Sequence, residues 1–438
     1  YTVGGSIRFD GSDLFGVDKK YRYLPLYSVS GLWRISQEPF MANAKWIDNL
    51  VVRASYGLQG NIDKNTSPYL LGNYRIENIL PGGSEDMIDV SGAPNKKLRW
   101  EKTHSVNAGF DFAVLNQAIN LSVDYYYRKG VDLIGTQMLP LETGFEMLTV
   151  NWASMQNQGV EVALSTRNIH TKNFMWTTNF NFAYNNNKIL KEALREDALE
   201  PGREGYPVGA LFALKTAGLD EEGYPMFEGK DGKAVSAMEF FKLQEWGFGA
   251  TDLTARERRE LYTYVGTADC PYTGGFNNTF TYKAFELGVN FSFDFGGKVR
   301  SQPTYSIVDF DKGRNTNRDI LNRWTPENTE TIFPVLLSQN ERLDEYMWYS
   351  NQNEIYRNLD IWIRDLNYVR LQNIRLGYTL PTNFSRKLGM TSATIAIEGR
   401  NLLVFGSSYK NYLDPETMSN AYATPAPKSV TLSLNLNF

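Results

Sequence analysis

The last ten residues of the chain alternate strictly between apolar and polar side chains. Val430, Leu432, Leu434, Leu436 and Phe438 take every second position, and Ser, Thr or Asn takes every position between them. A period of two places the apolar side chains on one face of a β-strand and the polar ones on the other. Because a half-buried strand of a soluble sandwich would show the same pattern, this segment alone predicts a two-faced strand and leaves its surroundings open.

The same alternation recurs along the whole chain. Two of the clearest copies cover residues 119–128 and 287–295. Aromatic residues make up 14% of the chain, and its mean hydropathy is −0.40, on the polar side. This combination is typical of a β-rich protein with solvent-exposed loops. About twelve strands are predicted, most of them close to the length that crosses a bilayer. They cover residues 3–10, 26–36, 50–56, 106–112, 119–128, 160–164, 178–184, 276–282, 287–295, 368–380, 393–402 and 429–438.

The connections between these strands alternate between short and long. Bacterial outer-membrane barrels have short periplasmic turns and long extracellular loops, whereas a soluble sandwich has no reason to gather its long loops at one end. The fold class predicted is therefore all-β, a transmembrane antiparallel β-barrel with the carboxyl terminus on the periplasmic side. Phe438, an aromatic last residue, has the form of the assembly signal of such barrels. The long connections fill residues 59–102, 130–155, 186–272, 298–366 and 403–427, of which 59–102, 186–272 and 298–366 are predicted as the large extracellular loops.

Two of the long loops are predicted to contain short helices. Thr254 and Glu257 have the spacing of a capping box, so a helix is expected over residues 257–262, with Asp252 as the alternative cap. A further helical turn is expected over residues 317–324. No stretch approaches the roughly 20 apolar residues of a transmembrane helix.

Several classes of function are disfavoured. The formal net charge is −4 and no basic cluster occurs, so nucleic acid is not an expected partner. Cys270 is the single cysteine, and His104 and His170 lie far apart, so neither a disulfide nor a zinc site is predicted. No phosphate loop or nucleophile elbow appears, and the chain is predicted not to be an enzyme and to bind no cofactor. Residues 309–313 contain a fragment of a calcium loop, Asp309, Asp311 and Gly313, for which a solvated turn is the preferred interpretation.

Charged side chains occupy the polar face of several predicted strands. Unpaired charge is costly inside a barrel wall, so opposite charges on neighbouring strands are expected to pair. The two interpretations are a lining that selects the cargo and a structural network, with the structural network favoured. These predicted lumen charges are Arg53, Asp111, Asp124, Arg128, Glu161, Asp294, Arg370, Glu398 and Arg400.

Aromatic side chains in the long loops are candidate ligand contacts, because their rings can stack on sugars or clamp a peptide. Aromatic residues at strand ends more often form the interfacial girdle of a barrel, and those in long loops often form a small core of the loop. The candidates are Trp246, Trp324, Trp348, Tyr349 and Tyr409.

Short motifs spread in order over nearly the whole chain resemble the SusC/RagA family of TonB-dependent outer-membrane transporters of Bacteroidetes. Each is weak alone, and their order makes the match specific. The stretches are RASYG from Arg53 with Gly60 and Asn61, WEKT from Trp100, NQGVE from Asn157, GLD from Gly218, Gly274 with Gly275, RWTP from Arg323, VRL from Val369, LGYTLP from Leu376 and GRNL from Gly399.

This resemblance implies a 22-stranded barrel in the bacterial outer membrane, of which residues 1–438 would be the C-terminal part. It further implies an N-terminal plug not visible in this chain, contact with TonB through that absent part, a SusD-like surface lipoprotein as a lid, and outer-membrane lipid around the wall. The implied function is energy-dependent import of oligosaccharides or peptides. The alternatives are a plug-less twelve-stranded porin or surface enzyme, and a SusC-like scaffold in a larger assembly. Because Tyr1 begins within a strand pattern, either the mature protein starts there or an N-terminal portion is missing.

Overall fold

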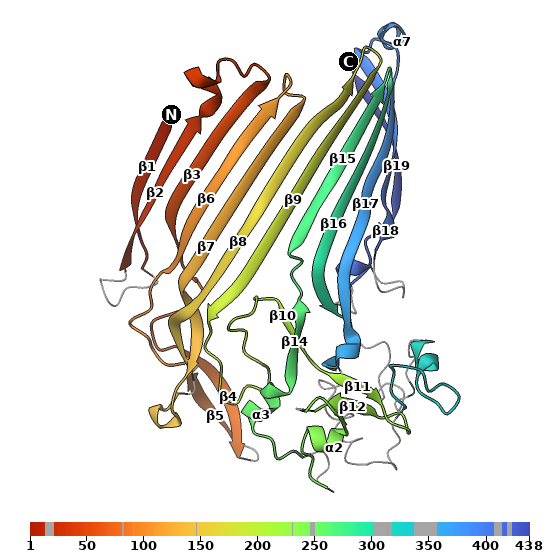
Figure 1. The fold of residues 1–438 in the computed structure, drawn as a ribbon. Coiled ribbons are helices and arrows are strands. Elements are labelled where there is room, and N and C mark those ends of the chain that lie inside the picture. Colours follow the sequence, from red (N-terminus) through yellow and green to blue (C-terminus); the bar gives the residue numbers. More distant parts are fainter. Residues whose placement is uncertain are drawn as a thin grey trace.

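The computed structural model describes residues 1–13, 22–80, 83–90, 92–145, 147–229, 231–245, 250–301, 313, 318–336, 357–406, 414–417 and 423–438. Its main feature is one curved antiparallel sheet of twelve strands that follow each other in chain order (Figure 1). Every strand predicted from the alternation overlaps one strand of this sheet, which confirms the predicted fold class. The strands are β1 (Thr2–Gly11), β2 (Tyr23–Arg34), β3 (Ile47–Asn61), β6 (Glu101–Val114), β7 (Ile119–Met138), β8 (Met147–His170), β9 (Phe174–Lys191), β15 (Tyr272–Tyr282), β16 (Phe285–Arg300), β17 (Ile363–Thr379), β18 (Ser392–Phe405) and β19 (Ser429–Asn437).

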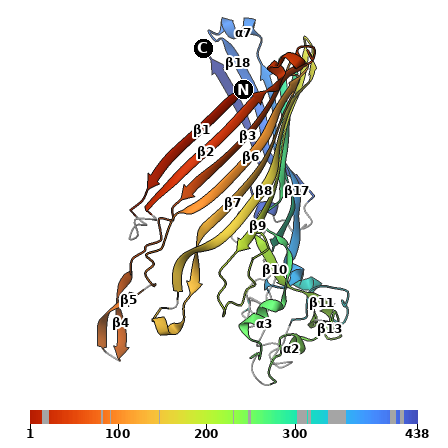
Figure 2. The ribbon, with the colours of Figure 1, turned by 60° about the vertical axis from the view of Figure 1, so that its left-hand side comes forward.

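The short and long connections lie at opposite ends of the sheet, as predicted (Figure 1). The turn between β6 and β7 is tight because Leu115, Asn116 and Gln117 all adopt positive φ angles of 56° to 57°. Longer connections at the same end carry η1 (Ile35–Gln37), η2 (Pro39–Met41) and α7 (Thr382–Lys387). Both ends of the chain also lie at this short-turn end (Figures 1 and 2). None of the described helices is long and apolar enough to cross a membrane.

The prediction of a long loop over residues 130–155 is wrong. Strands β7 and β8 continue through most of it and are joined only by residues 139–146, which include η3 (Leu141–Thr143). The pairing of the two strands shifts between Gly130 and Leu133. Such an irregularity adds residues to one strand and breaks the period-two pattern, so the alternation stops before the strand does.

The loop over residues 59–102 contains a hairpin for which no prediction was made. Strands β4 (Gly72–Leu80) and β5 (Gly83–Val90) pair with each other and with no other described strand. The hairpin projects away from the wall beyond the long-loop end (Figure 2). On one of its faces, Tyr74, Ile76 and Ile88 are each more than 60% exposed.

The remaining two large loops fold together into what we call the loop unit, residues 210–267, 320–336 and 357–362. The backbone N–H of Leu214 donates to the carbonyl of Asn358, and the backbone N–H of Val335 donates to that of Gly223. A common core forms around Phe227, which is fully buried. The other buried members are Leu214, Tyr224, Ala237, Phe241, Leu243, Leu359 and Trp362.

The secondary structure of the loop unit is short. Its elements are β10 (Ala210–Leu214), β11 (Thr216–Leu219), β12 (Pro225–Glu228), β13 (Ala234–Val235), α2 (Ala237–Phe240), α3 (Ala255–Glu260), β14 (Tyr262–Thr267) and η5 (Asp360–Trp362), and η4 (Arg318–Asn322) lies beside it. The predicted capping box is confirmed: Thr254 is the N-cap of α3 and exchanges hydrogen bonds with Glu257. The helix ends at Glu260 because Tyr262 begins a strand, and the helical turn predicted over 317–324 is the 3-10 helix η4.

The capping box makes the stability of α3 depend on pH. The backbone N–H and hydroxyl of Thr254 and the ammonium of Lys242 donate to the Glu257 carboxylate, which lowers its pKa from 4.5 to about 2. A lowered folded-state pKa means that this stabilisation is complete above about pH 4.5 and is lost as the pH falls through about 2. We expect hydrogen-exchange protection of residues 255–261, corrected for intrinsic rates, to fall between pH 5 and pH 2. In Glu257→Gln the decrease should be smaller, and an equal decrease in both proteins would contradict this assignment.

Candidate functional site

The two faces of the sheet differ sharply in chemistry. On the outer face of β19, Leu432 is 76% and Leu434 is 60% exposed. The pairing continues this face through Ile397 of β18 and Leu376 of β17 to Leu287 of β16. An apolar surface of this extent is not stable in water, and it fits the hydrocarbon of a bilayer.

Aromatic side chains border the outer face at both ends. Phe285 packs on Tyr378 at the short-turn end, with ring centres 4.7 Å apart, and Tyr184 stacks on Tyr272 at the long-loop end, with centres 5.2 Å apart. From Phe285 to Phe295 the strand advances ten residues. With about 3.3 Å per residue and a tilt of about 40°, the two belts are ~25 Å apart, which is the height of the apolar band of an outer-membrane barrel.

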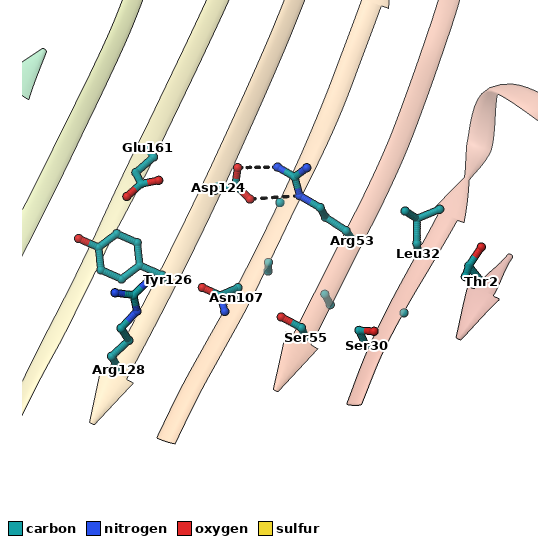
Figure 3. A pocket seen from close by; sticks show the side chains of 14 residues that line it. Thr2, Ser30, Leu32, Arg53, Ser55, Asn107, Asp124, Tyr126, Arg128 and Glu161 are labelled. Carbon is teal, nitrogen blue, oxygen red and sulfur yellow. Dashed lines mark hydrogen bonds and ion pairs between the residues drawn. The ribbon is translucent and has the colours of Figure 1, made fainter. Parts of the chain in front are cut away.

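The inner face carries an ion cluster built from three neighbouring strands, and Figure 3 shows its Arg53–Asp124 pair. The Arg53 guanidinium of β3 donates from Nη1 to Oδ2 of Asp111 on β6 at 2.9 Å, and from Nη2 to Oδ2 of Asp124 on β7 at 2.5 Å. The hydroxyl of Ser122 donates to the other Asp111 oxygen at 2.7 Å. The predicted pairing of opposite charges on neighbouring strands is therefore confirmed here.

Gly109 makes this arrangement possible. It lies directly across from both Arg53 and Asp124 in the sheet. A Cβ atom at position 109 would lie 2.3 Å from Oδ1 of Asp124 and 2.8 Å from the carbonyl oxygen of Val123. A glycine is therefore required for the Asp124 carboxylate to lie over the neighbouring strand and reach Arg53.

Beside the cluster lies a recess of about 500 Å³ in the inner face. Small side chains such as Ser30 and Ser55 form part of it, and Arg128 and Glu161 flank the Tyr126 ring (Figure 3). The Arg128 guanidinium lies 5.1 Å from the centre of that ring. Among the described residues, neither the Glu161 carboxylate nor the Arg128 guanidinium has an ion-pair partner, so the recess presents one unpaired charge of each sign.

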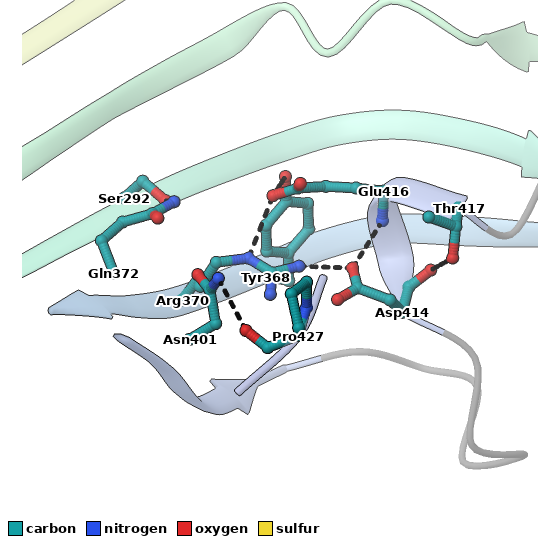
Figure 4. Close-up of polar contacts among 9 residues, drawn as sticks. All are labelled: Ser292, Tyr368, Arg370, Gln372, Asn401, Asp414, Glu416, Thr417 and Pro427. Carbon is teal, nitrogen blue, oxygen red and sulfur yellow. Dashed lines mark hydrogen bonds and ion pairs between the residues drawn. The ribbon is translucent and has the colours of Figure 1, made fainter. Parts of the chain in front are cut away.

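A second cluster fixes part of the last long loop to the inner face (Figure 4). Arg370 of β17 is 2% exposed and pairs with Asp414 through Nη2 and with Glu416 at 3.0 Å through Nε. The hydroxyl of Tyr368 donates to the same Glu416 oxygen at 3.2 Å. Asp414 precedes and Glu416 belongs to the 3-10 helix η6 (Pro415–Thr417), so this segment of the β18–β19 connection lies against the wall.

The structure thus separates the nine predicted lumen charges into groups. Arg370 and Asp294 lie on adjacent strands, with Asp294 directly across from Tyr368. Glu398 and Arg400 form their own pair along β18. The carboxylates that hold Arg370 were missed, because they lie in the long connection over residues 403–427, where no alternating pattern indicates contact with the wall. The remaining five predicted charges lie in or beside the Arg53 cluster and its recess: Arg53, Asp111, Asp124, Arg128 and Glu161.

Of the five predicted ligand-contact aromatics, only Trp324 lies within the described residues. Its indole lies against Gly223 of the loop unit, and its backbone N–H donates to the carbonyl of Phe333. Its side chain is only partly exposed. Trp246, Trp348, Tyr349 and Tyr409 lie outside the described residues, as do Asp309 and Asp311 of the calcium-like fragment.

Comparison with known proteins matches this arrangement to one family. The family model described as TonB dependent receptor-like, beta-barrel, matches residues 1–213. TonB-dependent receptor P3 of Formosa agariphila is 28% identical over all of this chain and 44% of the relative. TonB-dependent receptor SusC of Bacteroides thetaiotaomicron is 25% identical over all of this chain and 42% of the relative. The chain therefore spans less than half the length of the curated relatives that it matches.

The solved structures agree in fold. The RagAB peptide transporter superposes with a TM-score of 0.75 at 24% identity, over all of this chain and 46% of the solved chain. The prediction that the chain is not an enzyme agrees with these relatives, which are named as receptors and transporters. Over its whole length the chain is therefore similar in sequence to TonB-dependent receptors such as SusC, residues 1–213 match the β-barrel model of such receptors, and the RagAB transporter shares the fold.

Proposed function

We propose that the protein containing this chain imports oligosaccharides or peptides across the bacterial outer membrane, driven by TonB and assisted by a SusD-like surface lipoprotein. The observation that carries this proposal is the sheet itself, which combines an apolar outer face between two aromatic belts with a charged inner face. The wall would cross the membrane many times, with the long loops outside the cell. A polar inner face is what a path for hydrophilic cargo needs.

The loops at one end supply the surfaces that such a receptor uses. A two-stranded hairpin is only marginally stable by itself in water, and an exposed apolar patch commonly marks a protein interface. The exposed face of Tyr74, Ile76 and Ile88 on the β4–β5 hairpin therefore supports a protein partner at this end. We propose that the Arg53 cluster stabilises the wall, and that the loop aromatics Trp246, Trp324, Trp348, Tyr349 and Tyr409 contact the ligand.

Uptake in living cells tests the proposed function. Cells that carry the full-length receptor should accumulate fluorescent oligosaccharides or peptides, and cells that lack the gene should not. Collapse of the proton-motive force should abolish this uptake, because TonB draws on it. Uptake that persists without energy would support a porin, and absence of uptake for every probe would support the scaffold alternative.

Isolation of the receptor tests the partner. Tagged full-length receptor extracted from outer membranes in mild detergent should carry a surface lipoprotein in about equal amount. The lipoprotein should be lost when Ile76 and Ile88 are both replaced by Asp, because the hairpin would then present charge to an apolar interface. Receptor that never carries a lipoprotein would contradict the proposed partnership.

A further inference from the structure

The loop unit contains a pocket of about 890 Å³ with an apolar floor and a charged rim. The floor is formed by Val235, Phe240, Leu253 and Leu261. The rim carries three lysines and five carboxylates, so its formal charge is 3 − 5 = −2. The rim residues are Lys215, Lys233, Lys242, Glu228, Asp231, Glu239, Glu257 and Glu260.

Local interactions hold three parts of the pocket lining in place. The Phe240 ring stacks on the fully buried Phe227, with centres 4.7 Å apart. The hydroxyl of Ser236 accepts a hydrogen bond from the backbone N–H of Glu239 and caps α2. The capping box of Thr254 and Glu257 fixes α3 on the other side. A preformed pocket costs less ordering on binding than a flexible one.

Most rim charges already neutralise each other. Lys233 pairs with Asp231 at 3.2 Å, Lys242 pairs with Glu257 at 3.3 Å, and Lys215 pairs with Glu228. Glu260 is held by Arg256, which does not line the pocket. Within the part of the chain that the structure describes, the Glu239 carboxylate alone among the rim charges has no ion-pair partner, and its side chain is exposed. The rim therefore offers one free negative charge beside an apolar floor.

We propose that this pocket binds a peptide in which an apolar side chain lies next to a cationic group. The apolar side chain would cover the floor of Phe240 and Leu261, and the ammonium or guanidinium would pair with Glu239. Among the described residues, Phe240 is the only aromatic residue that lines the pocket, and one face of its ring packs on Phe227. The described part of the lining therefore offers no open aromatic platform on which sugars stack. This assignment rests on the proposed import function and specifies peptides as its ligand class.

The test is binding of two labelled pentapeptides to the purified full-length receptor, measured by fluorescence anisotropy. One peptide carries leucine next to lysine, and the other has glutamine in place of that lysine. The lysine peptide should bind about two- to fivefold more tightly, which is the size of one solvent-exposed ion pair. Glu239→Gln should abolish this difference, and Glu239→Lys should weaken the lysine peptide further.

Glu221→Gln is the matched control, because it removes an exposed carboxylate of the same loop unit that does not line the pocket. It should leave the preference for lysine unchanged. The inference is overturned if the two peptides bind equally, or if Glu239→Gln and Glu221→Gln have the same effect. If the inference is overturned in this way and energy-dependent uptake is still observed, the import function stands and only the peptide pocket is wrong. If no uptake is observed and the preference for lysine is intact, only the import function is wrong.

Discussion

Removing the carboxylates of Asp414 and Glu416 together is expected to destabilise the protein by about 3–5 kcal/mol, the usual cost of leaving a buried charge without its partner. Arg370 is 2% exposed on the inner face of β17, and these two residues are the carboxylates that pair with it. In the double variant Asp414→Ala with Glu416→Ala, the Arg370 guanidinium would stay buried with no carboxylate to balance its positive charge. Unfolding of the full-length receptor by guanidinium chloride in detergent, followed by tryptophan fluorescence, measures the loss of stability.

Adding Arg370→Met to that double variant provides the control. Replacement of a whole buried ion pair by apolar side chains is often close to neutral, so the triple variant should recover most of the lost stability. If the double variant is as stable as the wild type, the Arg370 cluster does not hold the 414–417 segment to the wall. If the triple variant recovers nothing, the loss comes from packing and not from unpaired charge.

Val289→Arg should impair folding into a bilayer by about 2–4 kcal/mol, the cost of a cation at the midplane of the lipid face of a barrel. Val289 lies on the outer face of β16, between the belt residues Phe285 and Phe295. Its neighbour Asn290 lies on the inner face, across from Asn277 and Asn373. The matched variant Asn290→Arg should therefore cost much less, because the inner face tolerates charge. The yield of folded full-length receptor in lipid vesicles can be measured for both variants from the mobility shift of the folded protein on unheated gels. Equal yields for Val289→Arg and Asn290→Arg would contradict the assigned faces.

The sequence predicted the wall of the fold better than its loops. In a wall that is apolar on one side and polar on the other, each strand carries a period-two signal, so all twelve strands were recognised. The signal failed at the Gly130 irregularity, where β7 and β8 continue beyond the alternation. It also failed in the loop unit, whose core joins Phe227 to Leu359 and Trp362 across more than 130 residues of sequence.

The same reason explains which parts of the candidate site were predicted. The pairing of Arg53 with Asp111 and Asp124 follows from charges on one face of adjacent strands. The pairing of Arg370 with Asp414 depends on where a long loop folds, which no local pattern indicates. The capping box of Thr254 was predictable because its hydrogen bonds join residues only three positions apart.

Lipid contact along β19 tests the central claim most directly. Single cysteines placed at positions 430–436 of the full-length receptor, in a Cys270→Ser background, would carry nitroxide labels whose collision with dissolved oxygen is measured in outer membranes. Oxygen concentrates in the hydrocarbon, so accessibility should be high at Leu432 and Leu434 and low at Thr431, Ser433 and Asn435, with a period of two residues. Accessibility without this period, or high on the polar positions, would contradict a strand that faces lipid on one side and the interior of a barrel on the other.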